Sequence, residues 1–246
     1  MKNTDELEKI LSYFADTFPF ENIDVLQKST DSITPQFLID KILEQQRGGL
    51  CYEINALLYL FLQELGYDVT LVKGTVYTDN GWATEGTHVL IVVHLNGNRY
   101  ILDNGFGSNI TRQPLEINGK SVESAAGMFR VVRRVSEKGS LAYEKKEANE
   151  WVLKYAFHLD ALPWEELDQI KSVITESESS AFNRQLIISQ CFNEQTYSIN
   201  ESRLRIKNED GEFDTAFQDI QDLSNTIQER TNVSIYKQAQ KYLLKK

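Results

Sequence analysis

The sequence is poor in cysteine and in basic residues, and each shortage excludes a class of protein. It holds two cysteines, Cys51 and Cys191, so no disulfide framework is expected and a reducing, cytoplasmic compartment fits. Lys and Arg number 26 against 36 Asp and Glu, and this net charge of −10 argues against a general binder of nucleic acid or anionic membranes. Long apolar runs are missing too. The longest, residues 56–62, is too short to span a bilayer, and residues 1–7 lack the apolar core of a signal peptide.

The 246 residues are otherwise typical of a globular chain, with 41% hydrophobic and 25% charged residues. Hydrophobic spacing predicts helices over 5–17 and 35–46, and a third from Cys51 to about Gly66. The pattern then becomes that of strands, over 69–77, 87–95, 98–103, 130–135, 141–146 and 150–157. The remainder predicts a helix over 163–181, strands over 186–190, 197–199 and 203–207, and helices over about 215–229 and 235–244.

These elements predict an α/β (α+β) protein in three parts. Residues 1–66 would form a helical domain, and residues 67–165 a β-barrel-like domain of antiparallel strands. Residues 166–246 would form a helical linker and an α/β lid.

The most informative stretch is residues 47–55, Arg-Gly-Gly-Leu-Cys-Tyr-Glu-Ile-Asn. Cys51 would lie in the first turn of a core helix, where unpaired backbone N–H groups and the helix dipole favour a thiolate. A free cysteine on an apolar helix is more often an inert hydrophobe, so position alone does not establish catalysis. Arg47, if buried, needs an acidic partner, and either Glu21 or Glu53 would serve.

A cysteine nucleophile needs a base, and the base needs an orienting group. Asn96-Gly97 between two strands predicts a two-residue type I′ hairpin. The resulting register places Asp103 on the same sheet face as His88, one diagonal step or about 7–8 Å away at the backbone. His94 lies near the turn, too far along the strand for Asp103 to orient it as well. His88 is therefore the better candidate for the base.

The stretch Arg47-Gly48-Gly49-x-Cys51-x-Glu53-x-Asn55 resembles the signature of the arylamine N-acetyltransferases, whose nucleophile is the cysteine of that motif. Similar family segments occur at 19–24, at Thr87-His88 and at residues 103–107, Asp-Asn-Gly-Phe-Gly. The resemblance implies that Cys51, His88 and Asp103 are nucleophile, base and orienting group. It also implies that the cofactor is bound beside the residues Thr87, Gly105, Phe106 and Gly107.

What the resemblance implies about function is a ping-pong acyl transfer on a papain/transglutaminase-like cysteine core. Acetyl-CoA would be the co-substrate, and an aromatic amine or hydrazine the acceptor. No metal, nucleic acid or membrane is expected to take part.

Other interpretations of the same residues stay open. An amide synthase, or a cysteine hydrolase of the papain or transglutaminase kind, would use the same three side chains, and a non-catalytic homologue would keep them as remnants. A zinc site made by Cys51, His88, His94 and Asp103 has suitable atoms, but no CxxC or HxxxH spacing supports it. His94 and His158 are expected to be surface or packing residues.

Overall fold

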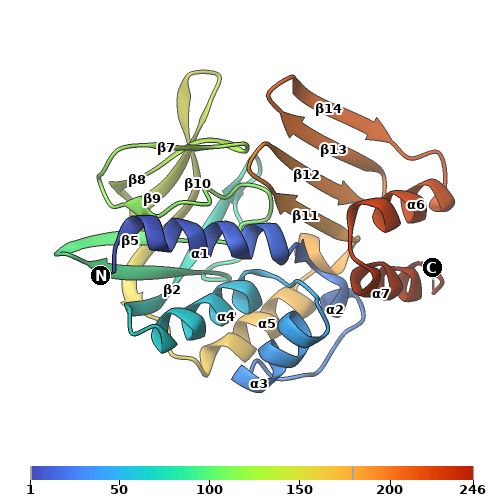
Figure 1. The fold of residues 1–246 in the computed structure, drawn as a ribbon, viewed down its shortest axis with the longest axis horizontal. Coiled ribbons are helices and arrows are strands. Elements are labelled where there is room, and N and C mark those ends of the chain that lie inside the picture. Colours follow the sequence, from blue (N-terminus) through green and yellow to red (C-terminus); the bar gives the residue numbers. More distant parts are fainter. Residues whose placement is uncertain (1, 179, 246) are drawn as a thin grey trace.

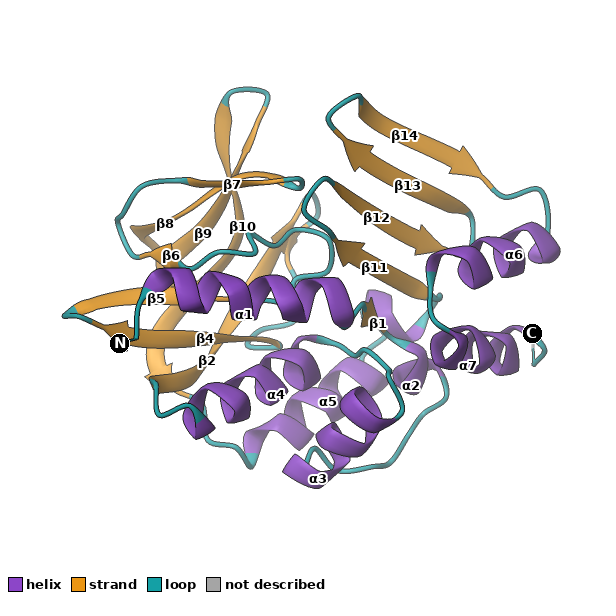
Figure 2. Cartoon of the chain, viewed as in Figure 1, coloured by secondary structure: helices purple, strands orange, loops and turns teal. Residues whose placement is uncertain are grey.

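The structure is a computed structural model that describes residues 2–178 and 180–245, where two sheets lie beside a group of helices (Figure 1). Figure 2 shows α3, α4 and α5 gathered on one side of the larger sheet, with α6 and α7 beside the smaller one. The helices are α1 (Thr4–Thr17), α2 (Ile23–Leu26), α3 (Pro35–Leu38), the π-helix η1 (Ile39–Glu44), α4 (Cys51–Glu64), α5 (Glu166–Glu176), the 3-10 helix η2 (Ala181–Asn183), α6 (Ile220–Arg230) and α7 (Val233–Leu243).

The larger sheet of this part of the chain has nine antiparallel strands and curls toward a barrel. The segment just after β6, at one end of the sheet, meets β8, near the other end, at a bridge between Ile117 and Val131, so the expected barrel-like sheet and the α/β class are confirmed. Its strands are β2 (Asp68–Thr78), β3 (Gly81–Trp82), β4 (His88–Leu95), β5 (Asn98–Leu102), β6 (Leu115–Glu116), β7 (Val122–Ser124), β8 (Gly127–Ser136), β9 (Gly139–Glu147) and β10 (Glu150–Ala161).

The smaller sheet is antiparallel and joins the two ends of the chain. It places β1, from just after α1, next to β11, with Phe20 opposite Ser189. Its strands, in spatial order, are β1 (Phe20–Glu21), β11 (Ile187–Cys191), β12 (Gln195–Asn200), β13 (Arg203–Asn208) and β14 (Gly211–Ala216).

The hairpin between β4 and β5 forms as the sequence predicts. Leu95 pairs with Asn98, and the turn residues Asn96 and Gly97 have φ of 53° and 84°, as a type I′ turn requires. The predicted left-handed cap after α4 is also present, because Gly66 has φ of 74°.

Two predicted elements differ from the structure. The helix expected over 35–46 is an α-turn followed by the π-helix η1, in which the N–H of Gln45 donates to the Asp40 carbonyl five residues earlier. The helix expected from about residue 215 begins at Ile220, because residues 211–216 pair with β13 instead. Apolar spacing alone does not reveal either outcome, because it reports neither the hydrogen-bond pattern within a helix nor the pairing of a segment with a distant strand.

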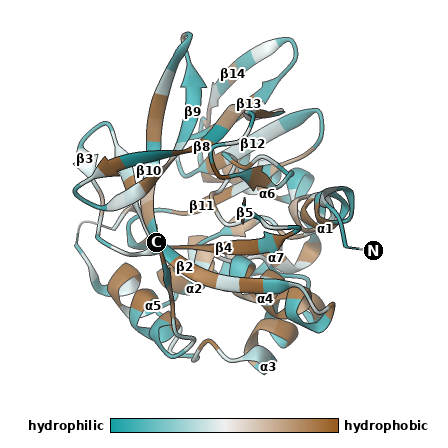
Figure 3. Ribbon diagram, turned by 90° about the vertical axis from the view of Figure 1, so that its left-hand side faces the viewer, coloured by the Kyte–Doolittle hydropathy of each residue, from teal (hydrophilic) through white to brown (hydrophobic). Residues whose placement is uncertain are grey.

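Strand β4 is buried on both faces, which fixes the position of His88 at its first residue. Val89, Ile91 and Val93 face α1, α4 and α5, whereas Leu90 and Val92 face the interior of the curled sheet. The sequence of such a strand is one nearly continuous hydrophobic run, which appears as the mostly brown colour of β4 in Figure 3. A third cluster packs α6 and α7 against the smaller sheet.

Every helix in residues 2–178 and 180–245 is too short or too polar to cross a bilayer.

Candidate active site

Cys51 is the first residue of α4, and two glycines before it are required by close contacts. A Cβ on Gly48 would lie 1.7 Å from the Pro19 carbonyl oxygen, and one on Gly49 would lie 2.6 Å from Glu53 Oε2. Because neither glycine carries a side chain, residues 48–49 can lie against β1 immediately before α4 begins. The backbone N–H of Cys51, at the start of a helix, has no intrahelical acceptor and adds to the positive end of the helix dipole.

His88 and Asp103 meet as the hairpin register predicts. His88 Nε2 lies 2.8 Å from Asp103 Oδ2, and the two side chains are about 4% and 2% exposed. Because Nε2 is engaged by the carboxylate, Nδ1 is the ring nitrogen left to serve the cysteine. The sulfur of Cys51 also lies 3.5 Å from the Thr87 carbonyl oxygen, which places it at the start of β4.

The electrostatics of the pair favour a protonated imidazole. Burial by itself would lower the pKa of His88, but the charge of Asp103 and hydrogen bonds with Asp103 and Cys51 raise it to about 10. Burial would likewise raise the pKa of the Asp103 carboxyl, but the charge of His88 and the hydrogen bonds it accepts lower it. An imidazolium held beside a cysteine stabilises the thiolate, which is the nucleophilic form.

Asp103 is held by donors that the sequence alone did not identify as partners. Asn55 Nδ2 and the N–H of Gly105 donate to its Oδ1, at 2.8 and 2.9 Å. The hydroxyl of Tyr155 donates to Oδ2 at 3.0 Å, so this oxygen accepts from both Tyr155 and His88. Asn55 belongs to the 47–55 motif, which could have indicated a role. Tyr155 lies in β10 with no motif around it.

The loop after Asp103 packs directly on the cysteine. A Cβ on Gly105 would lie 2.5 Å from the Cys51 Cα, so only glycine fits there. The ring of Phe106 lies 5.1 Å from the His88 ring, edge to face, and Gly107 has φ of 63°. This loop and Thr87 therefore border the cysteine, as expected from the sequence; their contacts with a cofactor stay a prediction.

His94, the other candidate for the base, lies near the turn between β4 and β5. His94 pairs with Arg99 near the hairpin turn, and its side chain is 40% exposed beside Asp68. Among the described residues, no group of three or more His, Cys, Asp and Glu side chains is placed to hold a metal ion.

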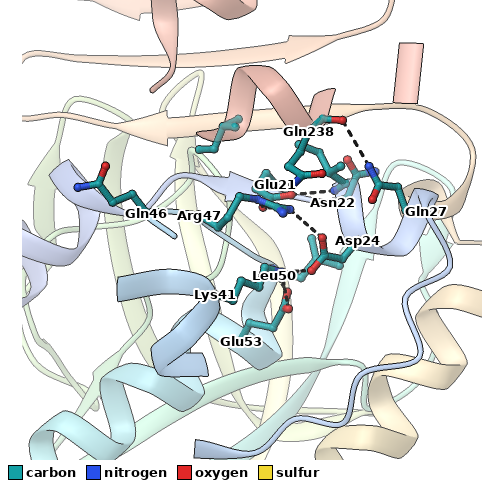
Figure 4. Close-up of polar contacts among 12 residues, drawn as sticks. Glu21, Asn22, Asp24, Gln27, Lys41, Gln46, Arg47, Leu50, Glu53 and Gln238 are labelled. Atoms are coloured by element: carbon teal, nitrogen blue, oxygen red, sulfur yellow. Dashed lines mark hydrogen bonds and ion pairs between the residues drawn. The ribbon is translucent and has the colours of Figure 1, made fainter. Parts of the chain in front are cut away.

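A buried network of charged side chains surrounds Leu50, the residue before Cys51 (Figure 4). Arg47 is paired with Glu21 at 2.6 Å and with Asp24 at 2.8 Å. Of the two partners expected for Arg47, Glu21 is therefore correct and Glu53 is not. Glu53 instead pairs with Lys41 at 2.6 Å, while its second oxygen accepts the N–H of Leu50 at 2.9 Å.

Comparison with known proteins identifies relatives along most of the chain. A family model described as N-acetyltransferase matches residues 3–240. An uncharacterized acetyltransferase of Bacillus subtilis, YvcN, is 39% identical over 187 residues, which are 75% of this chain and 74% of that protein.

Solved structures give the same result. The structure of arylamine N-acetyltransferase C from Bacillus anthracis aligns with a TM-score of 0.87 at 32% identity, covering 93% of this chain and 90% of that one. The NAT3 arylamine N-acetyltransferase from Bacillus cereus, described as having a Cys-His-Glu catalytic triad, aligns with a TM-score of 0.84 at 31% identity, covering 92% and 90%.

Proposed function

Because the chain belongs to the arylamine N-acetyltransferase family of acyltransferases, we propose that Cys51, His88 and Asp103 are its catalytic triad. The observation that carries the proposal is the buried 2.8 Å hydrogen bond between His88 and Asp103, with the Cys51 sulfur beside the same imidazole. The reaction is transfer of an acetyl group from acetyl-CoA to the nitrogen of an arylamine.

The first half-reaction acetylates Cys51. The Cys51 thiolate attacks the carbonyl carbon of the thioester, a C–S bond forms, and the C–S bond to coenzyme A breaks. The proton that His88 took from the thiol passes to the departing thiolate of coenzyme A. The Cys51 N–H, which as the first of α4 has no intrahelical acceptor, can donate to the oxyanion that develops on the carbonyl.

The second half-reaction transfers the acetyl group from Cys51 to the acceptor. An arylamine is neutral at pH 7 and attacks acetyl-Cys51 without first losing a proton. Its nitrogen then gives a proton to His88, and the restored thiolate leaves with that imidazolium beside it. Asp103 holds the ring so that one nitrogen always faces the sulfur.

The finer assignments belong to the same proposal. Hydrazines are acceptors as well, because they too are neutral nucleophiles at pH 7. Thr87, Gly105, Phe106 and Gly107 contact the acetyl-CoA arm or the acceptor ring, which their position around Cys51 supports. The net charge of −10 supports the absence of nucleic-acid and membrane partners. The two free cysteines, Cys51 and Cys191, fit a reducing, cytoplasmic compartment.

Initial-rate kinetics test the proposal. With acetyl-CoA and an arylamine both varied, we expect parallel double-reciprocal lines, the sign of ping-pong transfer. Replacing the arylamine by a hydrazine tests the wider acceptor range. Peptide cleavage without transfer from acetyl-CoA would contradict the proposal and favour a hydrolase.

A further inference from the structure

Lys41 is an unusual residue for its position, because its ammonium group is buried inside the helical part of the protein. The side chain is 4% exposed and comes from the π-helix η1, a wide turn that often marks a functional position. Its Nζ lies 2.6 Å from Glu53 Oε1 and 2.8 Å from Asp24 Oδ2. Burial by itself would lower the pKa of Lys41, but the charges of Glu53 and Asp24 raise it, so the group stays an ammonium.

Lys41 contacts the stretch before Cys51 in two ways, through its backbone and through its side chain. On one side, its carbonyl oxygen accepts the N–H of Arg47 at 3.1 Å, where the 47–55 stretch begins. On the other, its ammonium orients Glu53, whose second oxygen accepts the N–H of Leu50. Leu50 has no polar side chain to cap α4, so Glu53 provides the side-chain acceptor at this helix start. Cys51 is the next residue.

The charges in the network explain why Glu53 needs Lys41. Three carboxylates, Glu21, Asp24 and Glu53, surround two cations, Lys41 and Arg47, which leaves one net negative charge. Arg47 forms its ion pairs with Glu21 and Asp24 and not with Glu53. Without Lys41 the buried carboxylate of Glu53 would have no cation and would protonate or turn away from Leu50.

We propose that Lys41 is a positioning residue for acetyl transfer, acting through Glu53 and the Leu50 N–H to fix the backbone and sulfur of Cys51. The proposal rests on the proposed function, since Cys51 must be the nucleophile. The Lys41 side chain is buried and is therefore not exposed to a bound substrate. Its effect therefore belongs to the rate of the chemical step and not to the binding of acetyl-CoA.

A double-mutant cycle tests the inference with Lys41→Met, Glu53→Gln and the combined variant. The combined variant keeps the net charge of the network and leaves an amide oxygen to accept the Leu50 N–H. We expect Lys41→Met to lower kcat per folded molecule by roughly 10- to 100-fold with the KM for acetyl-CoA nearly unchanged. We expect the combined variant to regain much of that loss.

Lys171→Met is the matched control. Lys171 is also buried, on α5, donates to the carbonyl oxygen of Asp31 and lies over the Phe37 ring, but among the described residues it forms no ion pair with Glu53 or Asp24. It should lose stability without losing kcat per folded molecule. A folded Lys41→Met protein with wild-type kcat would overturn the proposal. A kcat of the combined variant that equals the product of the two single losses would also overturn it, because Lys41 and Glu53 would then act independently. If Lys41→Met does not fold, the combined variant should have nearly the kcat of Glu53→Gln, because Lys41 acts through Glu53, and a kcat far below that of Glu53→Gln overturns the proposal.

The rate at which iodoacetamide alkylates Cys51 is a second measurement that needs no acetyl-CoA. It should fall in Lys41→Met and recover in the combined variant. A wild-type protein that accepts no acetyl group would refute the proposed function. An alkylation rate that is unchanged across the cycle would refute the role of Lys41 alone.

Discussion

At the scale of single residues, the proposed chemistry depends on the carboxylate of Asp103. It is buried, accepts hydrogen bonds from four groups, and faces an imidazole whose pKa it raises. Two consequences can be measured directly: one for the rate and one for stability.

Asp103→Asn is expected to lower kcat by roughly 1,000- to 10,000-fold, because an amide cannot stabilise the imidazolium and can hold the wrong tautomer. Asp103→Glu keeps the charge and is the matched variant. A glutamate is described in the triad of the Bacillus cereus relative, so this variant should retain far more activity, reduced by the extra methylene in a packed site. Equal activity of the two variants in steady-state assays would contradict the assignment of Asp103.

The raised pKa of His88 also predicts how stability changes with pH. The pKa rises from 6.5 in the unfolded chain to about 10 in the folded protein, so the native state binds more protons between these values. This contribution to stability is complete below pH 6.5 and is lost as the pH rises toward 10. Its size is on the order of 1 to 4 kcal/mol.

Urea unfolding at pH 6.5 and pH 9.5 measures this contribution in a Cys51→Ala background, where no thiol gives its proton to the ring. The loss of unfolding free energy between the two pH values should be smaller when His88→Gln is added than in Cys51→Ala alone. His94→Gln in the same background, which changes an exposed histidine, should behave like Cys51→Ala. An identical loss in all three proteins would show that His88 does not carry the effect.

At the scale of elements, two segments converge on the cysteine: the first turn of α4 and the loop over 103–107. Their closest approach is at Gly105, where a side chain would meet the backbone of Cys51. The loop therefore packs against the backbone of Cys51, the proposed nucleophile, as well as bordering the site.

Gly105→Ala tests this contact. Its Cβ would lie 2.5 Å from the Cys51 Cα, so the loop or α4 must move, and we expect a loss of about 2 kcal/mol or more of stability together with most of the activity. Gly81→Ala is the control, because Gly81 has open space around it and only its φ of 93° opposes a side chain, at about 1 kcal/mol. Activity that survives in Gly105→Ala as well as in Gly81→Ala would contradict the account of this loop.

At the scale of the whole molecule, the parts of the chain share their cores. Strand β1 from the N-terminal segment pairs with β11 from the C-terminal one, and α5 contributes to the cluster that contains α1 and α4. In Figure 1, α1 extends from the larger sheet to the smaller one. We propose that the division into 1–66, 67–165 and 166–246 describes the order of parts in the chain and not units that fold alone.

Thermal unfolding should therefore show one cooperative transition. The fluorescence of Trp82, Trp151 and Trp164 reports on the parts before residue 166, and far-UV circular dichroism reports on all helices and strands. Both signals should change at the same midpoint. Two separated transitions would show that the C-terminal part is an independent unit.

Much of this arrangement could be predicted from the sequence, because its determinants are local. Asn96-Gly97 fixes the hairpin register, and that register brings His88 to Asp103. The contact of Tyr155 could not be predicted, because β10 and Asp103 are far apart in the chain. The contact of Lys41 could not be predicted either, because it depends on how η1 packs against α4. The pairing of Glu53 with Lys41 is between buried charges, which an apolar pattern does not reveal.

The measurement that tests the central claim most directly is the mass of the intact protein after mixing with acetyl-CoA alone. We predict the gain of one acetyl group, located on Cys51 by peptide mapping, and its removal when an arylamine is added. Cys51→Ala should gain none, although Cys191 remains. A wild-type protein that stays unmodified, or that carries the acetyl group on another residue, would contradict the account.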